Sequence, residues 1–204
     1  GSLKSGNLSS VRIATIYGAA CPPNIAYALE NAMPRGSVGQ MWGMTECFMG
    51  LHTPFDAPAN VRCESLGDVT PTFEVRIISE NGSAIADNIE GALEIRGCSV
   101  VARYFNNEES NRTAFTGDGW FRTGDLATRG LDGLLRITGR EKDLINRGGI
   151  KINPTDIEAV IDTHPSVVMS AITPLPDEVL GERLCLYVQL KPNEALSLEQ
   201  ICEW

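Results

Sequence analysis

The sequence is short of positive charge. It holds 17 lysine and arginine residues against 26 aspartate and glutamate residues, a formal net charge of -9. Nucleic-acid affinity depends on neutralising phosphates with basic side chains, so this balance argues against a nucleic-acid-binding protein. An anionic ligand would have to be held locally, by backbone dipoles, a metal ion or a few placed cations.

Long apolar runs and paired cysteines are also missing. No apolar run approaches the roughly 20 residues of a transmembrane helix, and the N-terminal residues lack the apolar core of a signal peptide. The six cysteines are scattered, with no Cys-x-x-Cys pair and no histidine at metal-ligand spacing. We therefore expect free thiols in a reducing compartment, no membrane span and a cytoplasmic protein.

What the sequence does contain is enough apolar material for one or two globular domains. Of 204 residues, 43% are hydrophobic and 21% are charged. Residues 11–17 are typical of a strand, and the helix predicted after Pro22-Pro23 has an apolar face, which together indicate an α/β unit. Residues 39–46 break the pattern and predict a glycine-rich loop, and residues 73–140 predict short strands of an antiparallel sheet or small barrel.

The character of the chain changes again after residue 139, where we expect a domain boundary. Asn153-Pro154 begins a predicted helix with an N-cap side chain and proline at its first position. Strands are predicted at 167–172 and 184–190, and Ser197 with Gln200 forms the capping box of a last helix. The whole chain is therefore predicted to be mixed α+β.

Two short segments could bind a nucleotide. In Trp42-Gly43-Met44-Thr45-Glu46, tryptophan could stack on a base, threonine could hydrogen-bond a phosphate oxygen, and glutamate could hold Mg²⁺. In Thr123-Gly124-Asp125, the carboxylate could accept both hydroxyls of a ribose. Taken alone, the first segment is more simply a tight turn with a core tryptophan, and the second is more often a local backbone cap.

A third segment, residues 139–152, is longer and more informative. Its charged cluster could be a solvated hairpin, but Gly148-Gly149 beside Ile150 suggests backbone that must approach another group closely. Residues 176–182, between the two predicted strands, would ordinarily be a polar connection.

In their order and spacing these segments resemble the adenylate-forming (AMP-binding) superfamily of acyl-CoA synthetases, nonribosomal-peptide adenylation domains and luciferase-like ligases. The family's Tyr-Gly-x-Thr-Glu loop is similar to residues 42–46, with Trp42 in place of tyrosine. Its Gly-Glu-Leu-x-Ile-Arg-Gly strand is similar to residues 91–97, where Ala92 replaces glutamate. Its Trp-Phe-x-Thr-Gly-Asp motif resembles residues 120–125, and its glycine-rich hinge segment resembles residues 139–152.

The resemblance implies a role for each matching residue. In the nucleotide site, these roles fall to Gly18, Ala19 and Ala20 lining the adenine pocket, Trp42 stacking on the base beside Gly43, Thr45 at the α-phosphate, Glu46 on Mg²⁺, and Asp125 with Arg140 at the ribose. Lys142 would lie at the hinge of a swivelling C-terminal domain, and Gly148 and Gly149 would approach the pantetheine arm of CoA. Thr45, Glu46 and Lys142 would be the catalytic residues.

The resemblance further implies a C-terminal fragment of an ATP-dependent acid–thiol ligase. Residues 1–139 would be the end of the large AMP-binding domain, with an α/β segment at 1–60 and a β-rich part at 61–139, and residues 140–204 an incomplete small domain. The ligands would be a small-molecule carboxylic acid, ATP with Mg²⁺, and CoA. The alternatives are an adenylation domain that loads a carrier-protein pantetheine and a non-catalytic nucleotide-binding module.

Two lysine elements of the family have no counterpart here. Nothing in the sequence resembles its lysine-containing phosphate loop, and Lys191-Pro192-Asn193 does not match the Gly-Lys context of its catalytic lysine. We therefore expect that this polypeptide alone does not form an acyl-adenylate.

Overall fold

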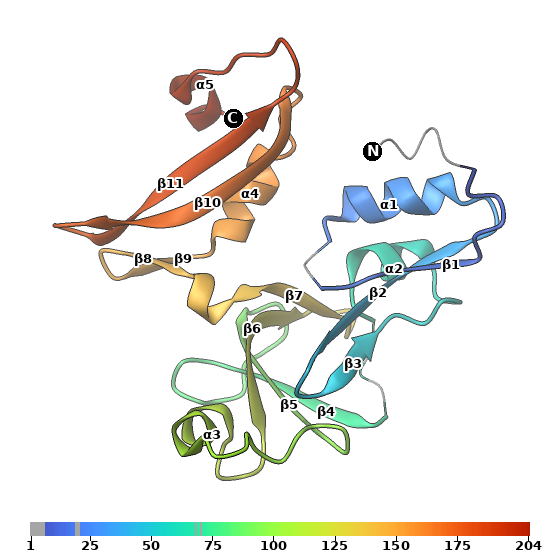
Figure 1. The fold of residues 1–204 in the computed structure, drawn as a ribbon, viewed down its shortest axis with the longest axis vertical. Helices are drawn as coiled ribbons and strands as arrows, with labels where there is room; N and C mark the ends of the chain where they lie inside the picture. Colours follow the sequence, from blue (N-terminus) through green and yellow to red (C-terminus); the bar gives the residue numbers. More distant parts are fainter. Residues whose placement is uncertain (1–6, 19–20, 68, 70) are drawn as a thin grey trace. The chain divides into compact units, whose positions relative to one another are not determined.

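The computed structural model describes residues 7–18, 21–67, 69 and 71–204. The chain divides into two compact units, Gly1–Thr138 and Gly139–Trp204, and Figure 1 labels the elements of each. Within the described part of the chain, no helix has the length and apolar character needed to cross a bilayer.

The first unit begins with the predicted α/β arrangement. Its elements are β1 (Ile13–Ile16), α1 (Pro23–Ala32), β2 (Ser37–Met44), β3 (Phe48–His52) and α2 (Ala59–Glu64). Strand β1 pairs in parallel with β2, and β3 pairs with β2 in the antiparallel sense. Proline at the first turn starts α1. Ala26 of α1, Val38 of β2 and Cys63 of α2 are fully buried in one cluster, so the helices cover the sheet (Figure 1).

The prediction of a loop at residues 39–46 was wrong. Strand β2 runs through Met44, and the turn comprises only residues 45–47. The glycines lie in the strand because neighbours approach too closely for a side chain. A Cβ on Gly39 would lie 2.7 Å from Cε1 of Phe55, and one on Gly43 would lie 2.0 Å from the carbonyl oxygen of Phe48. Such glycines mark close packing in a strand rather than a loop.

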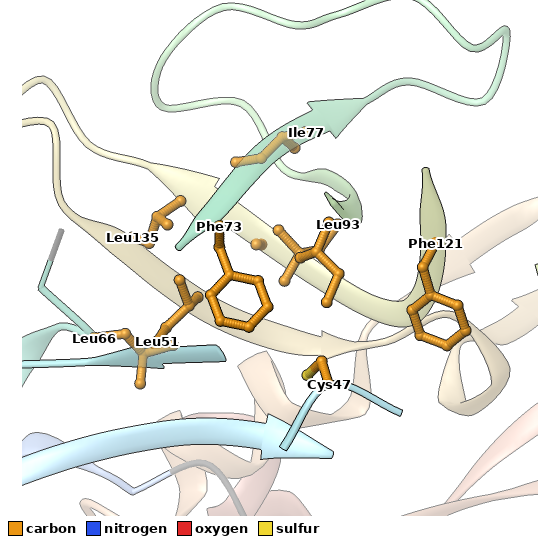
Figure 2. Close-up of a cluster of buried hydrophobic side chains, with 10 residues drawn as sticks. Cys47, Leu51, Leu66, Phe73, Ile77, Leu93, Phe121 and Leu135 are labelled. Atoms are coloured by element: carbon orange, nitrogen blue, oxygen red, sulfur yellow. The ribbon is translucent and has the colours of Figure 1, made fainter. Parts of the chain in front are cut away.

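The predicted β-rich part is an open sheet rather than a barrel. Its strands are β4 (Phe73–Ile78), β5 (Gly91–Gly97), β6 (Phe121–Arg129) and β7 (Leu135–Arg140), in the order β4-β5-β6-β7, with α3 (Glu108–Ala114) between β5 and β6. Strand β5 is antiparallel to both β4 and β6. Figure 2 shows Cys47 and Leu51 meeting Phe73 and Leu93 in one buried cluster. The open sheet and the α/β segment therefore share a core.

The second unit is a small α+β layer. Its elements are the 3-10 turn Glu141–Asp143, β8 (Ile145–Arg147), β9 (Ile150–Ile152), α4 (Pro154–Ile161), β10 (Val167–Asp177), β11 (Gly181–Leu190) and α5 (Leu198–Cys202), with the strand order β10-β11-β8-β9. Both predicted helix starts are confirmed. The Asn153 side chain accepts a bond from the backbone N–H of Thr155, and the capping box of Ser197 and Gln200 is complete.

The hairpin of β10 and β11 is longer than predicted. Strand β10 continues through Pro174 and Pro176, so most of the expected polar connection at 176–182 belongs to strand ends. Proline has no backbone N–H to donate to a neighbouring strand. It is tolerated in β10 because β10 is an edge strand of the sheet, with a neighbour on one side only among the described strands.

Candidate functional site

The two predicted nucleotide-binding segments meet in the structure. The indole Nε1–H of Trp42, near the end of β2, donates a hydrogen bond of 2.7 Å to Oδ2 of Asp125 in β6. These residues are 83 positions apart in the sequence. Asp125 is only 7% exposed, so the bond forms in a largely desolvated setting, where a charge-assisted hydrogen bond is strong.

A bulge in β6 sets the position of Asp125. Residues 123–125 stand opposite Leu93 alone, between the pairs Glu94↔Arg122 and Ala92↔Leu126. Gly124 has a φ of +73°, which favours glycine. The hydroxyl of Thr123 accepts from the Asp125 amide at 3.0 Å and donates to the Leu93 carbonyl at 2.8 Å. The local sequence Thr-Gly-Asp therefore builds a bulge that directs the carboxylate.

Glycines on both strands make room for Trp42. The register of β2 and β3 shifts between Trp42 and Gly43, where the backbone of Phe48 comes close. A Cβ on Gly50 would lie 2.7 Å from Cζ3 of the indole. The indole thus lies directly over Gly50, with its N–H directed at Asp125.

Thr45 and Glu46 lie in the turn that follows β2. Thr45 is exposed, and Glu46 is partly buried. The hydroxyl of Tyr104 donates to Oε1 of Glu46 at 2.8 Å, and the amide of Val101 donates to the Glu46 carbonyl at 2.8 Å. Burial, together with the hydrogen bond to Glu46, raises the pKa of Tyr104 to about 12, so the phenol stays protonated and remains a donor. Sequence reasoning missed Tyr104, since no motif around it carries a chemical signal.

Cys47, the next residue, is an inert core thiol. It is fully buried. Burial raises the pKa of its thiol, and the charges of Glu46 and Asp125 act in the same direction. A protonated, buried thiol is neither a nucleophile nor a metal ligand.

Gly18 lies at the same sheet edge as Trp42. The last parallel pair of β1 and β2 is Ile16↔Gln40, and each of these two residues comes two positions beyond it. Ligands of α/β sheets bind at the carboxyl ends of parallel strands, so this placement is compatible with the predicted adenine pocket. Ala19 and Ala20, predicted with Gly18, lie outside the described residues.

The remaining predicted residues belong to the second unit, into which the last two residues of β7 extend. Arg140 ends β7 and Lys142 lies in the 3-10 turn, both exposed. Gly148 and Gly149, with φ of 60° and 91°, join β8 to β9 as a two-residue turn of the I′ kind, which needs positive φ at both positions. The Gly148 amide donates to the Leu180 carbonyl at 2.8 Å. The turn itself accounts for both glycines, whatever ligand approaches them.

The Glu46 side chain has the chemistry to bind a magnesium ion that substrate phosphates also coordinate. Among the described residues, no group of three or more histidine, cysteine, aspartate or glutamate side chains could form a protein cage for a metal. Mg²⁺ is commonly held by one or two carboxylates together with substrate phosphates, and a single carboxylate in a turn meets that need.

Comparison with known proteins shows the family of the chain. The family model described as AMP-binding enzyme matches residues 2–105, a little over half of the chain and including both Trp42 and Glu46. The chain belongs to the AMP-binding enzyme family. The predicted resemblance to adenylate-forming enzymes is therefore confirmed.

Relatives of this member of the AMP-binding enzyme family include CoA ligases. It is 40% identical over 163 residues to 2-hydroxy-7-methoxy-5-methyl-1-naphthoate–CoA ligase of Streptomyces carzinostaticus, covering 79% of this chain and 29% of that protein. It is 35% identical over 193 residues to a salicylyl-CoA synthase / salicylate adenylyltransferase of a Streptomyces species, covering 94% and 34%. The chain spans about a third of the length of these curated relatives.

The fold agrees with solved members of the family. The crystal structure of ATP-bound MatB from Rhodopseudomonas palustris matches with a TM-score of 0.89 and 27% identity, over 98% of this chain and 41% of that one. The predicted mixed α+β fold is confirmed by this match.

Proposed function

We propose that this chain supplies part of the nucleotide site of an ATP-dependent acid–thiol ligase, which adenylates a carboxylic acid and transfers the acyl group to CoA. The hydrogen bond between Trp42 and Asp125 carries the proposal, because it joins two motifs of different strands into one site. The similarity to a naphthoate–CoA ligase and to a salicylyl-CoA synthase supports it.

Trp42 and Asp125 would bind the adenosine part of ATP. The bond to Asp125 uses the edge of the indole, so stacking of adenine would involve the ring face. A carboxylate has about four lone-pair positions, so the Asp125 carboxylate would accept ribose hydroxyls beside the bond from the indole. Gly18, Ala19 and Ala20 would line the base pocket, and Arg140 would lie beside the ribose.

Thr45 and Glu46 would act at the phosphates. The exposed hydroxyl of Thr45 would donate to an α-phosphate oxygen, and Glu46 would hold Mg²⁺. When bound, Mg²⁺ neutralises phosphate charge and favours attack of the carboxylate at the α-phosphate, with pyrophosphate as the leaving group. Gly43 lets the Phe48 backbone close the turn that carries both side chains.

The second unit would serve the thiol step. Lys142 would lie at the hinge between functional domains 1–139 and 140–204, and Gly148 and Gly149 would approach the pantetheine arm. A thiol then displaces AMP. All six cysteines are free thiols, which supports a reducing, cytoplasmic setting. The second candidate acceptor is a carrier-protein pantetheine, since adenylation of the acid would precede transfer to either thiol.

Calorimetric titration of the full-length protein with AMP and with 2′,3′-dideoxy-AMP tests the ribose role. Each hydroxyl bound to the carboxylate is worth about 1.5–3 kcal/mol, so we expect the dideoxy analogue to bind at least about tenfold more weakly. Asp125→Ala should remove this discrimination, while Asp132→Ala, in an exposed turn, should keep it. Equal binding of both nucleotides by the unmodified protein would refute the proposal.

Two activity measurements complete the test. Comparison of CoA with a pantetheine-loaded carrier protein as acceptor separates the two candidate functions. The 204 residues contain no counterpart of the lysine-containing phosphate loop, so we propose that they alone do not catalyse ATP–pyrophosphate exchange. Robust exchange by this polypeptide would contradict that expectation.

A further inference from the structure

The segment between β5 and α3 holds Glu46 at two points. The Tyr104 hydroxyl donates to its carboxylate at 2.8 Å, and the Val101 amide donates to its carbonyl at 2.8 Å. We propose that Tyr104 is a positioning residue, which fixes the Glu46 carboxylate in the orientation that receives a nucleotide-bound divalent cation. This inference rests on the proposed function, in which Glu46 holds Mg²⁺.

Tyr104 is itself held firmly by α3. Its amide donates to Oδ1 of Asn111 at 2.7 Å, and its carbonyl accepts from Nδ2 of the same side chain at 3.0 Å. The carboxamide of Asn111 thus binds both polar groups of the Tyr104 backbone. Asn107 caps α3 through a bond from the Ser110 amide, so the helix that presents Asn111 begins at a defined residue.

The Tyr104 ring is packed against the core of the sheet. Its centroid lies 6.1 Å from that of Phe115 in an edge-to-face arrangement, and Phe115 lies 5.1 Å from Phe121. Phe121 is only 2% exposed. The phenol oxygen is therefore presented to Glu46 by a ring with little freedom to move.

A fixed neutral donor suits a carboxylate that must bind a metal. The bond occupies one of about four lone-pair positions and adds no positive charge that would repel a cation. Outer partners that orient a metal ligand are typically worth about 10- to 100-fold in metal affinity or activity. A purely structural role for the bond would instead lower the stability of the fold and leave metal affinity unchanged.

The chain offers a matched control on other elements. The hydroxyl of Tyr27 in α1 donates to Oε1 of Glu64 in α2 at 2.6 Å, a bond of the same chemistry. Neither residue belongs to the candidate site. Tyr27→Phe therefore reports the general effect of removing a hydrogen bond from a tyrosine hydroxyl to a glutamate in this protein.

The test measures, by electron paramagnetic resonance, how tightly Mn²⁺ binds to the full-length protein. The protein is saturated with ATP, and the carboxylic-acid substrate is left out. Tyr104→Phe should weaken Mn²⁺ binding by about 10- to 100-fold, with metal-free AMP affinity unchanged, and Tyr27→Phe should match the unmodified protein. Asn111→Ala should weaken Mn²⁺ binding in the same direction, which covers the case in which Tyr104→Phe does not fold.

Each contrary result has a distinct meaning. Unchanged or tighter Mn²⁺ binding by Tyr104→Phe, with folding verified by thermal unfolding, overturns the positioning role while the proposed function stands. An equal loss of metal-free AMP binding also overturns it, since the effect would then be general. If the unmodified protein binds no Mn²⁺ with ATP, the metal role of Glu46 in the proposed function fails, and this inference fails with it.

Discussion

An ion pair between the two helices of the first unit should dominate the stability of that segment. Nη2 of Arg62 in α2 lies 2.6 Å from Oε1 of Glu30 in α1, and Nη1 donates to Oε2 at 2.7 Å. The side chains are only 8% and 16% exposed. Arg62 also donates to the carbonyl of Val38 at 2.8 Å, and Glu30 accepts from the Val38 amide at 2.7 Å. The pair therefore ties both helices to β2.

Removal of either partner should be costly. Glu30→Leu would strip the buried guanidinium of two charge-assisted bonds, each worth about 1.5–3 kcal/mol. Breaking a buried pair from one side typically costs about 3–5 kcal/mol, because the remaining charge is left uncompensated. We expect this loss for Glu30→Leu and for Arg62→Met, and a clearly smaller loss than the sum for the double variant.

The pH dependence follows from the carboxyl group. The bond from Arg62, the largest cause, lowers the pKa of Glu30 below its ordinary value. A lowered pKa means that the pair stabilises the fold above the unfolded pKa of about 4.3, and that this contribution is lost as the pH falls through the folded pKa. The difference between the unmodified protein and Glu30→Leu should therefore shrink on acidification below about pH 4.

Urea unfolding of the 204-residue chain measures these values. Because the two units can unfold separately, fluorescence should be followed with Trp204 of the second unit replaced by phenylalanine, so that Trp42 and Trp120 report the first unit. Asp132→Asn, which breaks an exposed pair with Arg136, is the control and should change little. Losses below about 1 kcal/mol for both single variants, or additive losses in the double variant, would refute the reasoning.

Three further changes have defined outcomes. Trp42→Phe keeps an aromatic face but loses the N–H that binds Asp125, so discrimination between AMP and its dideoxy analogue should fall by about tenfold in calorimetry; unchanged discrimination would contradict the pairing. Gly43→Ala should destabilise the first unit in urea, because its Cβ would lie 2.0 Å from the Phe48 carbonyl oxygen, and a neutral effect would show that β2 and β3 adapt. Gly149→Ala, at a φ of 91° with open space around it, should cost about 1–2 kcal/mol in the second unit, with Gly149→Asn less damaging if backbone strain is the cause.

The features predicted well from sequence are those decided by neighbouring residues. Asn153-Pro154 and the Ser197 to Gln200 capping box start helices in the structure because each signal acts within one helical turn. The strand pattern of residues 73–140 is similarly local, since alternation and turn residues suffice to indicate hairpins.

Features decided by distant contacts could not be predicted in the same way. Gly39 suggested a loop, yet it lies in β2. A glycine stands at this strand position because the Phe55 ring occupies the space that a Cβ would need. The sequence contains Trp42 and Asp125 as candidates, but only folding shows that their side chains bond. Tyr104 gave no signal at all, because its contact with Glu46 joins residues 58 positions apart.

The two candidate carboxylates each accept a hydrogen bond from a neutral aromatic side chain. Glu30 and the almost fully buried Glu94 bond to arginines, and such pairs supply their own positive charge. Asp125 accepts a bond from an indole N–H and Glu46 accepts one from a phenol O–H, as Glu64 does from Tyr27 outside the candidate site. A neutral donor orients a carboxylate without neutralising its charge, which is what the proposed contacts with a ribose hydroxyl and with a cation require.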